Sequence, residues 1–199
     1  MASIIYKWSI DEWHELVDSG VLEGKPVELL EGNIVEMGPE GIEHSYTNQS
    51  VSDYLRDLLR GKAHIREAHP ITLDNSEPEP DIAVVELPTT IAFGDSPLPK
   101  AMSDCSSSHR QHHPFPQNIY LLIEISNRSL KKDLEEKIIT YARNGIPEYW
   151  VIDLKNKKLI VHTQPQNGIY SRIVEYRSGT IAPQAFTDIN IDLSKLLLY

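Results

Sequence analysis

The stretch Ile119-Tyr120-Leu121-Leu122-Ile123-Glu124-Ile125-Ser126 decides the fold, because it is an apolar strand that carries a carboxylate. A continuous apolar run of this length is typical of a strand in the core of a sheet. An ionised carboxylate is costly to bury, so a chain keeps one there where a cation or a hydrogen-bond donor compensates the charge. Upstream, Pro80-Asp81-Ile82-Ala83-Val84-Val85 places a second acid at the mouth of another apolar run. Acids on two core strands predict a metal site at Asp81 and Glu124.

The composition favours a single globular domain over residues 1–199. The chain is 40% hydrophobic, and no apolar run approaches the roughly 20 residues that a membrane span needs. The N-terminus lacks the features of a secretory signal, and the lone Cys105 cannot form an internal disulfide. We therefore expect a cytoplasmic protein with no membrane partner. The formal net charge of −10 argues against a large basic surface that binds nucleic acid. A phosphate-bearing substrate would therefore be bound locally, by a metal or by a small basic cluster.

Periodicity and turn signals predict an α/β domain. Capping signals, helical spacing and stop residues predict helices at about 9–20, 43–60, 130–144 and 193–198. Apolar runs between turn signals predict strands at 27–30, 34–37, 65–73, 82–86, 119–126, 148–154, 158–163 and 170–176.

The segment at about 87–117 is rich in proline, serine and histidine, and it is too long for an ordinary connection. We expect it to be a flexible insertion. It contains zinc-type ligands, but their spacing matches no closed structural zinc site. These ligands are Cys105, His109, His112 and His113.

Lys137 lies on the apolar stripe of the expected helix at 130–144. Leu134, Lys137, Ile138 and Tyr141 fall at positions i, i+3, i+4 and i+7, so Lys137 points towards the sheet. An ammonium beside the two carboxylates would stabilise charge that develops on a phosphate. The alternative is a lysine that pairs locally with Asp133 and extends towards solvent.

Asp81, Glu124 and Lys137 together outline phosphodiester hydrolysis. Carboxylate oxygens are the ligands that Mg²⁺ prefers, and the ion keeps waters that a substrate phosphate can replace. The cation orients or activates water and offsets negative charge on the phosphate.

Several stretches of the sequence together resemble a known superfamily. They are Pro80-Asp81, Glu124-Ile125-Ser126, the helix that bears Lys137, and Tyr141-Ala142-Arg143-Asn144-Gly145-Ile146-Pro147-Glu148-Tyr149-Trp150. This set resembles the PD-(D/E)XK nuclease superfamily, and more closely its bacterial branch of restriction-endonuclease-like proteins of unknown function. The resemblance extends from the hairpin at 27–32 to the strand at Tyr149, and more loosely to the end of the chain.

The resemblance implies both a fold and a chemistry. The fold would be a restriction-endonuclease-like core, an α/β (α+β) domain with helices packed on a central mixed β-sheet. Asp81 and Glu124 would bind Mg²⁺, with Mn²⁺ as a substitute, and DNA would be the substrate. The superfamily's usual motif has a lysine two residues after the acidic ligand, where this chain has Ser126. In this branch the following helix supplies the ammonium, which assigns that role to Lys137.

His44 is an accessory candidate. The stretch Gly41-Ile42-Glu43-His44 matches a setting in which the resembling family has a histidine that faces the site. The alternative is that His44 is a hydrogen-bonded core residue. Glu43 beside it would then be the alternative acid of the site. Glu28 and Glu31 could also approach the metal, but acids in a hairpin or beside prolines usually face solvent, so four acids are left out of the site. They are Glu28, Glu31, Glu77 and Glu79.

The sequence thus predicts a Mg²⁺-dependent endonuclease that acts on DNA, with Asp81 and Glu124 as metal ligands, Lys137 as the catalytic ammonium and His44 as an accessory residue. Ser126 and the negative net charge favour one rival, a nuclease-like binding or assembly module without turnover. Another rival is a structural homo-oligomer in which Glu124 and Lys137 form a core ion pair. Because nucleases that cut both strands are commonly dimers, a homodimer also stays open.

Overall fold

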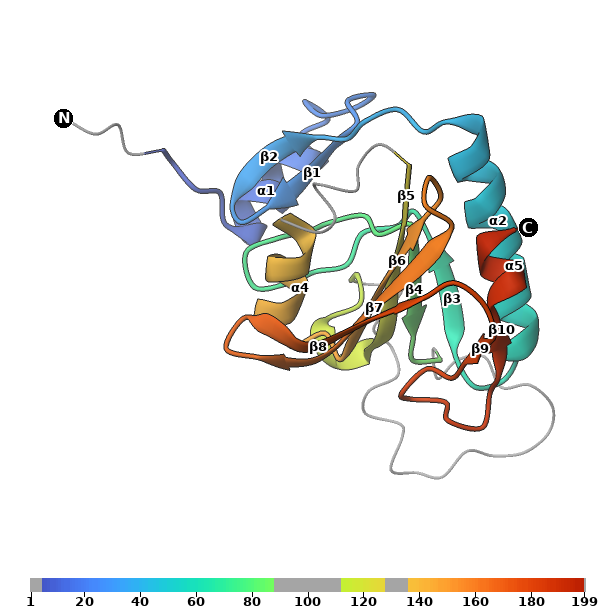
Figure 1. Cartoon of the computed structure of the whole chain (residues 1–199). Coiled ribbons are helices and arrows are strands. Elements are labelled where there is room, and N and C mark those ends of the chain that lie inside the picture. The colour runs from blue at the N-terminus through green and yellow to red at the C-terminus, as the bar shows by residue number, and fades with distance from the viewer. Residues whose placement is uncertain (1–4, 88–111, 128–135, 199) are drawn as a thin grey trace, which may run out of the picture.

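A six-stranded mixed sheet forms the centre of the protein (Figure 1). The structure is a computed structural model that describes residues 5–87, 112–127 and 136–198. The strand order is β3-β4-β5-β6-β7-β8, in which β5 and β6 are parallel and the other neighbours are antiparallel. The strands are β3 (His64–Glu67), β4 (Ile82–Val85), β5 (Ile119–Ser126), β6 (Glu148–Asp153), β7 (Lys158–Gln166) and β8 (Ile169–Tyr176). The mixed sheet confirms the predicted fold class.

The central strands are apolar along their whole length because both faces of the sheet are covered. Along β4, Ile82 and Val84 belong to one buried cluster, and Ala83 and Val85 belong to another. Alternate residues of a strand point to opposite faces, so each cluster lies on its own side of the sheet. Burial on both faces explains why β4, β5 and β6 read as continuous apolar runs rather than as alternating patterns.

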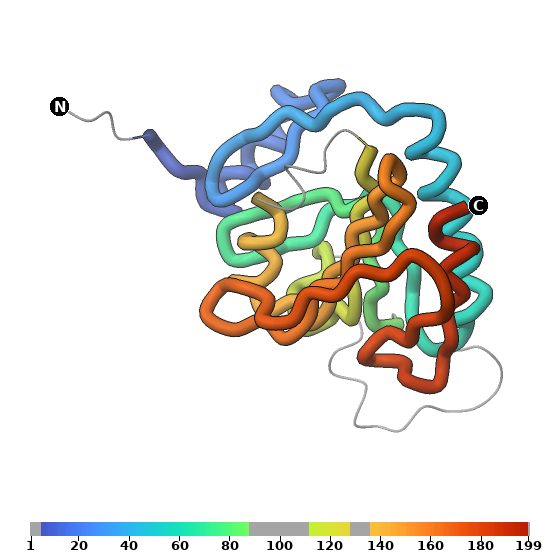
Figure 2. Tube along the Cα trace, viewed as in Figure 1, coloured from blue at the N-terminus to red at the C-terminus, as the bar shows by residue number. Residues whose placement is uncertain are grey.

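Helices cover the two faces unequally. On one face, α2 (Ile42–Leu58) lies beside α5 (Leu193–Leu197), and both contribute leucines to the first cluster (Figures 1 and 2). On the other face, the short α4 (Ile138–Arg143) contributes Tyr141 to the second cluster. Within the described ranges, none of the helices has the length and apolar character needed to cross a membrane.

The N-terminal region forms a separate unit against the main sheet. Helix α1 (Ile10–Asp18) begins at a capping box. The Glu12 N–H donates to Ser9 Oγ, and the Ser9 N–H donates to Glu12 Oε2. It is followed by a hairpin of β1 (Val27–Leu30) and β2 (Asn33–Glu36). The two turn residues, Glu31 and Gly32, have φ of 49° and 70°, as a tight hairpin turn requires.

The hairpin is attached to the body of the protein through its turn and its first strand. Gly32 N–H donates to Asn75 O at 2.8 Å, and Glu77 N–H donates to Leu29 O at 2.8 Å. A short pairing of β9 (Thr180–Ile181) with β10 (Ile191–Asp192) precedes α5. The two hydrogen bonds of the hairpin join it to residues 75–77, in the segment that leads into β4.

Two expected segments differ from the structure. The strand expected at 65–73 ends at Glu67, because Ala68 adopts a φ of 44° and turns the chain. Of the insertion expected at 87–117, residues 88–111 lie outside the described part. Its end is ordered: Thr72 N–H donates to Pro114 O, and a 3₁₀ turn, η3 (Pro116–Asn118), leads into β5.

Candidate active site

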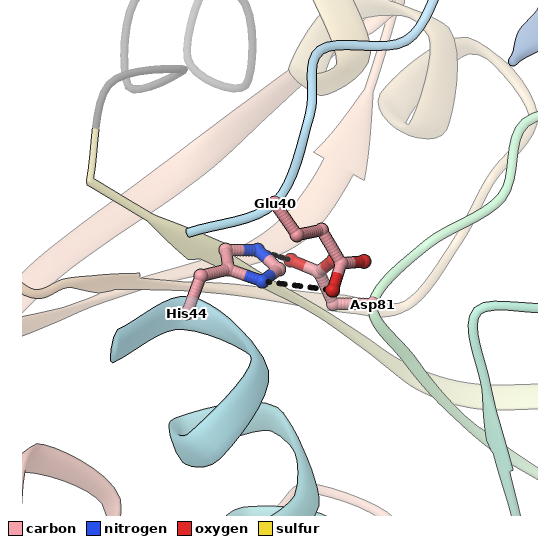
Figure 3. A group of neighbouring side chains, drawn as sticks. All are labelled: Glu40, His44 and Asp81. Atoms are coloured by element: carbon pink, nitrogen blue, oxygen red, sulfur yellow. Dashed lines mark hydrogen bonds and ion pairs between the residues drawn. The ribbon is translucent and has the colours of Figure 1, made fainter. Parts of the chain in front are cut away.

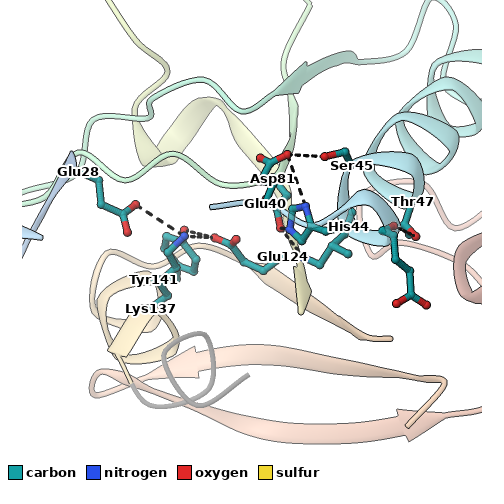
Figure 4. A network of polar contacts seen from close by, with 11 residues as sticks. Glu28, Glu40, His44, Ser45, Thr47, Asp81, Glu124, Lys137 and Tyr141 are labelled. Carbon is teal, nitrogen blue, oxygen red and sulfur yellow. Dashed lines mark hydrogen bonds and ion pairs between the residues drawn. The ribbon is translucent and has the colours of Figure 1, made fainter. Parts of the chain in front are cut away.

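The predicted site residues gather where β4 and β5 emerge from the core (Figure 4). Ile82 pairs with Ile123 in antiparallel register. Asp81 lies immediately before β4 and bonds to Ile125 of β5 and to His44 of α2. Glu124 of β5 bonds instead to Lys137 and Tyr141, and it is not a member of the group of close ligand atoms around Asp81. Segments distant in sequence complete the group from the hairpin, from the start of α2 and from α4. The contributing residues are Glu28, Glu40, His44, Asp81, Glu124, Lys137 and Tyr141.

Asp81 is fixed from two sides. Its Oδ2 accepts a hydrogen bond from the Ile125 backbone N–H at 2.5 Å and lies 3.1 Å from His44 Nε2. The side chains of Asp81 and His44 are each 14% exposed. The backbone bond holds the carboxylate against β5, and the first turn of α2 brings the imidazole to it. His44 therefore faces the site rather than a purely apolar core.

Glu124 is buried and receives two donors on one oxygen. Its Oε1 accepts from Lys137 Nζ at 2.8 Å and from the Tyr141 hydroxyl at 2.9 Å. Burial first, and then the nearby Glu124 carboxylate, raise the pKa of Tyr141 well above its usual range. The phenol therefore stays protonated and remains a donor. The ion pair and the hydrogen bond together meet the cost of placing a carboxylate in the core.

Lys137 enters the site from the residue immediately before α4. Its backbone is already helical, with φ −63° and ψ −38°, so Lys137 and Tyr141 lie one turn apart and point at the same carboxylate. The side chain of Lys137 is only 8% exposed. Lys131 and Lys132, two other lysines of the helix expected at 130–144, lie outside the described residues, as does Asp133.

Glu28 is a site residue that sequence reasoning missed. The expectation that it faces solvent is wrong, since the residue is 1% exposed and its Oε2 lies 3.7 Å from Lys137 Nζ. The same oxygen accepts the Glu79 backbone N–H at 3.2 Å. Lys137 is thus held between two buried carboxylates, Glu28 and Glu124. The signal was the adjacent Leu29-Leu30 pair, because consecutive apolar residues indicate a strand that is covered on both faces.

The environment of Glu28 also affects the next acid. Burial first, and then the negative charge of Glu28, raise the pKa of the Glu79 carboxyl. Glu79 is half-buried rather than fully solvated. Glu28, Glu79 and Glu124 therefore lie around the buried ammonium of Lys137.

Glu40 joins His44 and Asp81 in a compact group of potential metal ligands (Figure 3). One ligand atom from each residue lies within 4.8 Å of the others. Glu40 Oε2 is 3.8 Å from His44 Nδ1, and it accepts from Ser45 Oγ at 2.9 Å. Glu40 lies before the N-cap Gly41 of α2, so helical spacing in the sequence did not point to it.

Glu77 belongs to a different, structural network. The expectation that it is solvated is wrong, because the residue is 5% exposed. Its carboxylate lies within hydrogen-bond distance of Trp13 Nε1 (3.2 Å), His14 Nε2 (2.8 Å) and Thr72 Oγ1 (2.8 Å). These contacts tie α1 to the body of the protein, away from Asp81.

The remaining sequence candidates are also placed. Ser126 is fully buried, and its backbone carbonyl accepts the Leu154 N–H at 2.9 Å. Of the zinc-type ligands, Cys105 and His109 lie outside the described residues. His113 Nε2 lies 4.0 Å from Glu77 Oε1, at the structural network.

Comparisons with known proteins bear on the family and the fold of the chain. Residues 11–194 match the family Uma2, whose description reads "Putative restriction endonuclease". A solved structure from Anabaena variabilis, described as a "putative nuclease belonging to DUF820", superposes with a TM-score of 0.70. The two chains are 16% identical, and the match covers 96% of this chain and 97% of the other. At this identity the likeness shows the fold alone. No curated protein matches the chain.

Proposed function

The chain belongs to the Uma2 family, and from this membership we propose that it is a divalent-metal-dependent endonuclease that hydrolyses phosphodiester bonds in DNA. One observation carries the proposal. Asp81 bonds to the Ile125 N–H of β5 at 2.5 Å, and the neighbouring Glu124 accepts the buried ammonium of Lys137 at 2.8 Å. Two carboxylates and an ammonium are the groups that phosphodiester hydrolysis needs.

The donor set fits a hard cation. Asp81 and Glu124 offer carboxylate oxygens at the end of the sheet, which suits Mg²⁺ and also Mn²⁺. When bound, the ion would supply Lewis acidity and make a coordinated water more acidic. The chain's own residues hold the ligands in place: the Ile125 N–H and His44 orient Asp81, and Tyr141 orients Glu124. Preorganised ligands of this kind lower the cost of assembling the reactive arrangement.

Lys137 has the role of stabilising charge on the phosphate. Its ammonium is the one that the site holds beside Glu124, and an ammonium in a water-poor setting acts strongly on developing negative charge. The net charge of −10 repels DNA as a whole. Substrate binding would therefore depend on the cation and on local basic groups. Cleavage of both strands would further need two such sites, which a homodimer would provide.

One observation favours the rival of an inactive binding module. Lys137 already lies between Glu124 and Glu28, and a lysine fully engaged by two carboxylates can serve as a structural ion pair. A structural homo-oligomer would contain the same Glu124–Lys137 ion pair in its core. An activity measurement separates these readings from the nuclease.

The test is nicking of supercoiled plasmid in Mg²⁺ or Mn²⁺ by the parent protein and by Asp81→Asn, Glu124→Gln and Lys137→Met. Each variant is expected to lose at least about 100-fold in rate, the scale seen when a group that stabilises a transition state is removed. Asp57→Asn is the matched control, because the Asp57 side chain is 76% exposed and forms an ion pair with the exposed Arg60. A parent that binds DNA but cuts it in neither metal would establish the binding module. Cleavage unchanged by Asp81→Asn would remove the assigned site.

A further inference from the structure

We propose that the turn between β6 and β7 is a contact site for the phosphate backbone of duplex DNA, with Lys155, Lys157 and Arg177 as its cations. The inference rests on the proposed function for its meaning and deepens it, because it gives the substrate a binding surface beside the candidate site. The contact itself can be measured without cleavage. The chain carries a net charge of −10, so a polyanion would be attracted only where cations gather locally.

The turn lies at the same end of the sheet as the candidate site. Strands β5 and β6 are parallel, and Glu124 pairs with Val151. The Leu154 N–H donates to Ser126 O at 2.9 Å, which ties the start of the turn to the end of β5. Figure 1 shows this turn beside the end of β5. Lys155 follows Val151 by four residues, which is at most about 13 Å along the strand direction. One strand of duplex DNA advances that distance in about four nucleotides, so a duplex held at Glu124 can also reach the turn.

Hydrogen bonds hold the backbone of the turn in one arrangement. The buried Asp153 accepts the Asn156 backbone N–H at 3.0 Å and the Asn156 side-chain amide at 2.7 Å. Arg177, which directly follows β8, donates to Asn156 O at 2.8 Å. Lys155 and Lys157 flank this fixed asparagine, and both lysines are exposed. The cations therefore belong to a preorganised turn, which lowers the ordering cost of binding a ligand.

The two lysines of the turn keep their charge for a ligand. Glu175 of β8 pairs with the neighbouring Lys158 at 2.5 Å. Within the described ranges, neither Lys155 nor Lys157 has a carboxylate at ion-pair distance. Carboxylates do pair with several basic side chains elsewhere, which are Arg56, Arg60, Lys62, Lys137 and Arg143.

The backbone of Lys157 is an independent observation that points to the same use. Its φ is 47°, in the left-handed region that glycine and asparagine adopt more readily than lysine. A turn optimised for its backbone alone would place one of those two residues there. Because the lysine brings no backbone advantage, its charge is the useful property at this position.

The experiment measures binding of a labelled DNA duplex to the full chain by fluorescence anisotropy over a range of salt concentrations. Binding is measured in chelator and again in Ca²⁺, which takes oxygen ligands. Each phosphate contact that is lost should reduce the slope of log K against log salt concentration by about 0.9. The double variant Lys155→Gln/Lys157→Asn should therefore reduce the slope by about 1.8 and the affinity by at least about 10-fold, equally for unrelated DNA sequences.

Arg60→Gln/Lys62→Gln is the matched control, because it removes the same charge at the opposite end of the sheet. Both residues precede β3, and its first residue, His64, pairs with Val85 at the end of β4. The control should change neither the slope nor the affinity. The same loss in the control as in the double variant would overturn the inference.

The variant Lys157→Asn separates a DNA contact from a structural role. Asparagine tolerates the left-handed backbone, so the melting temperature should stay the same or rise while DNA affinity falls. A lower melting temperature with unchanged affinity would assign Lys157 a structural role and overturn its assignment here. If Lys157→Asn does not fold, Lys155→Gln alone, with an expected slope change of about 0.9, keeps the test decisive.

An unchanged salt slope in the double variant would overturn the inference, as would a loss confined to one DNA sequence or a parent protein that binds no duplex in either buffer. The outcome for the nuclease is separate. Lysine-dependent DNA binding by a chain that cuts no DNA would retain the contact site and remove the nuclease proposal. Cleavage by the parent, with an unchanged salt slope in the double variant, would retain the nuclease and remove the contact site.

Discussion

Replacing Lys137 by methionine should destabilise the metal-free protein strongly, because it leaves two carboxylates buried without their cation. Lys137 Nζ lies 2.8 Å from Glu124 Oε1 and 3.7 Å from Glu28 Oε2. Both acids are almost fully buried, at 3% and 1% exposure. Methionine has a similar length and shape, so the substitution removes the charge and keeps most of the packing.

The geometry sets the size of the effect. At an effective dielectric constant of about 20, the two separations correspond to gross attractions of about 6 and about 4.5 kcal/mol. Desolvation of the three groups offsets much of this gain, and removing one partner of a buried ion pair typically costs about 3–5 kcal/mol. That loss is a large share of the roughly 5–15 kcal/mol by which domains are stable. With a urea dependence of about 2 kcal/mol per molar, the unfolding midpoint should fall by about 1.5–2.5 M.

The assay is urea unfolding followed by tryptophan fluorescence in chelator-treated buffer. Lys62→Met is the matched control, because Lys62 pairs with Asp188 at a site where both side chains are exposed, 41% and 69%. An exposed pair contributes about 0–1 kcal/mol. The double variant Lys137→Met/Glu124→Gln should recover part of the loss, since it removes one of the two unpaired charges. A Lys137→Met midpoint no lower than that of the control would refute the reasoning and would mean that Lys137 does not compensate buried charge.

Two further predictions concern the rest of the core. Glu77→Gln should lower the free energy of unfolding by about 1–3 kcal/mol, because the new amide group cannot accept every hydrogen bond that the carboxylate accepts and a buried donor loses its partner. An unchanged urea midpoint and unchanged Trp13 fluorescence would contradict this prediction. Burial lowers the pKa of His162, which stacks on Tyr149, from the ordinary value of 6.5. Below about pH 6.5 the unfolded chain therefore binds more protons than the folded one, so stability is full above that pH and is lost as the pH falls. His162→Gln should flatten this dependence between about pH 7 and pH 5 when unfolding is measured by circular dichroism, and an unchanged slope would refute the assignment.

Local signals in the sequence predicted most of the secondary structure. The capping box at Ser9 and Glu12 forms as expected because both of its partners lie within one turn. The strands β4, β5 and β6 follow from apolar runs, which need no knowledge of the rest of the fold. The strand expected to continue past Glu67 fails because Ile71 and Leu73 bond to loop carbonyls instead, and those partners are set by tertiary structure.

The candidate site could be predicted where a residue sits on a periodic element. Lys137 and Tyr141 point at Glu124 because helical spacing fixes their direction relative to the sheet. Glu28 and Glu40 could not be placed in the same way. Glu28 is buried by the packing of the hairpin against the body, and Glu40 precedes its helix, so neither position has a periodicity that determines its surroundings. The roles of these residues stay predictions until activity and metal binding are measured.

The order in which the site residues occur along the chain has a consequence for synthesis. Glu28, His44, Asp81 and Glu124 all emerge from the ribosome before Lys137, and β5 needs the later strand β6 as its parallel neighbour. A nascent chain that ends before Lys137 therefore has the acids but neither the ammonium nor the strand β6. If the protein cuts DNA, that activity cannot begin before Lys137 and β6 have been synthesised.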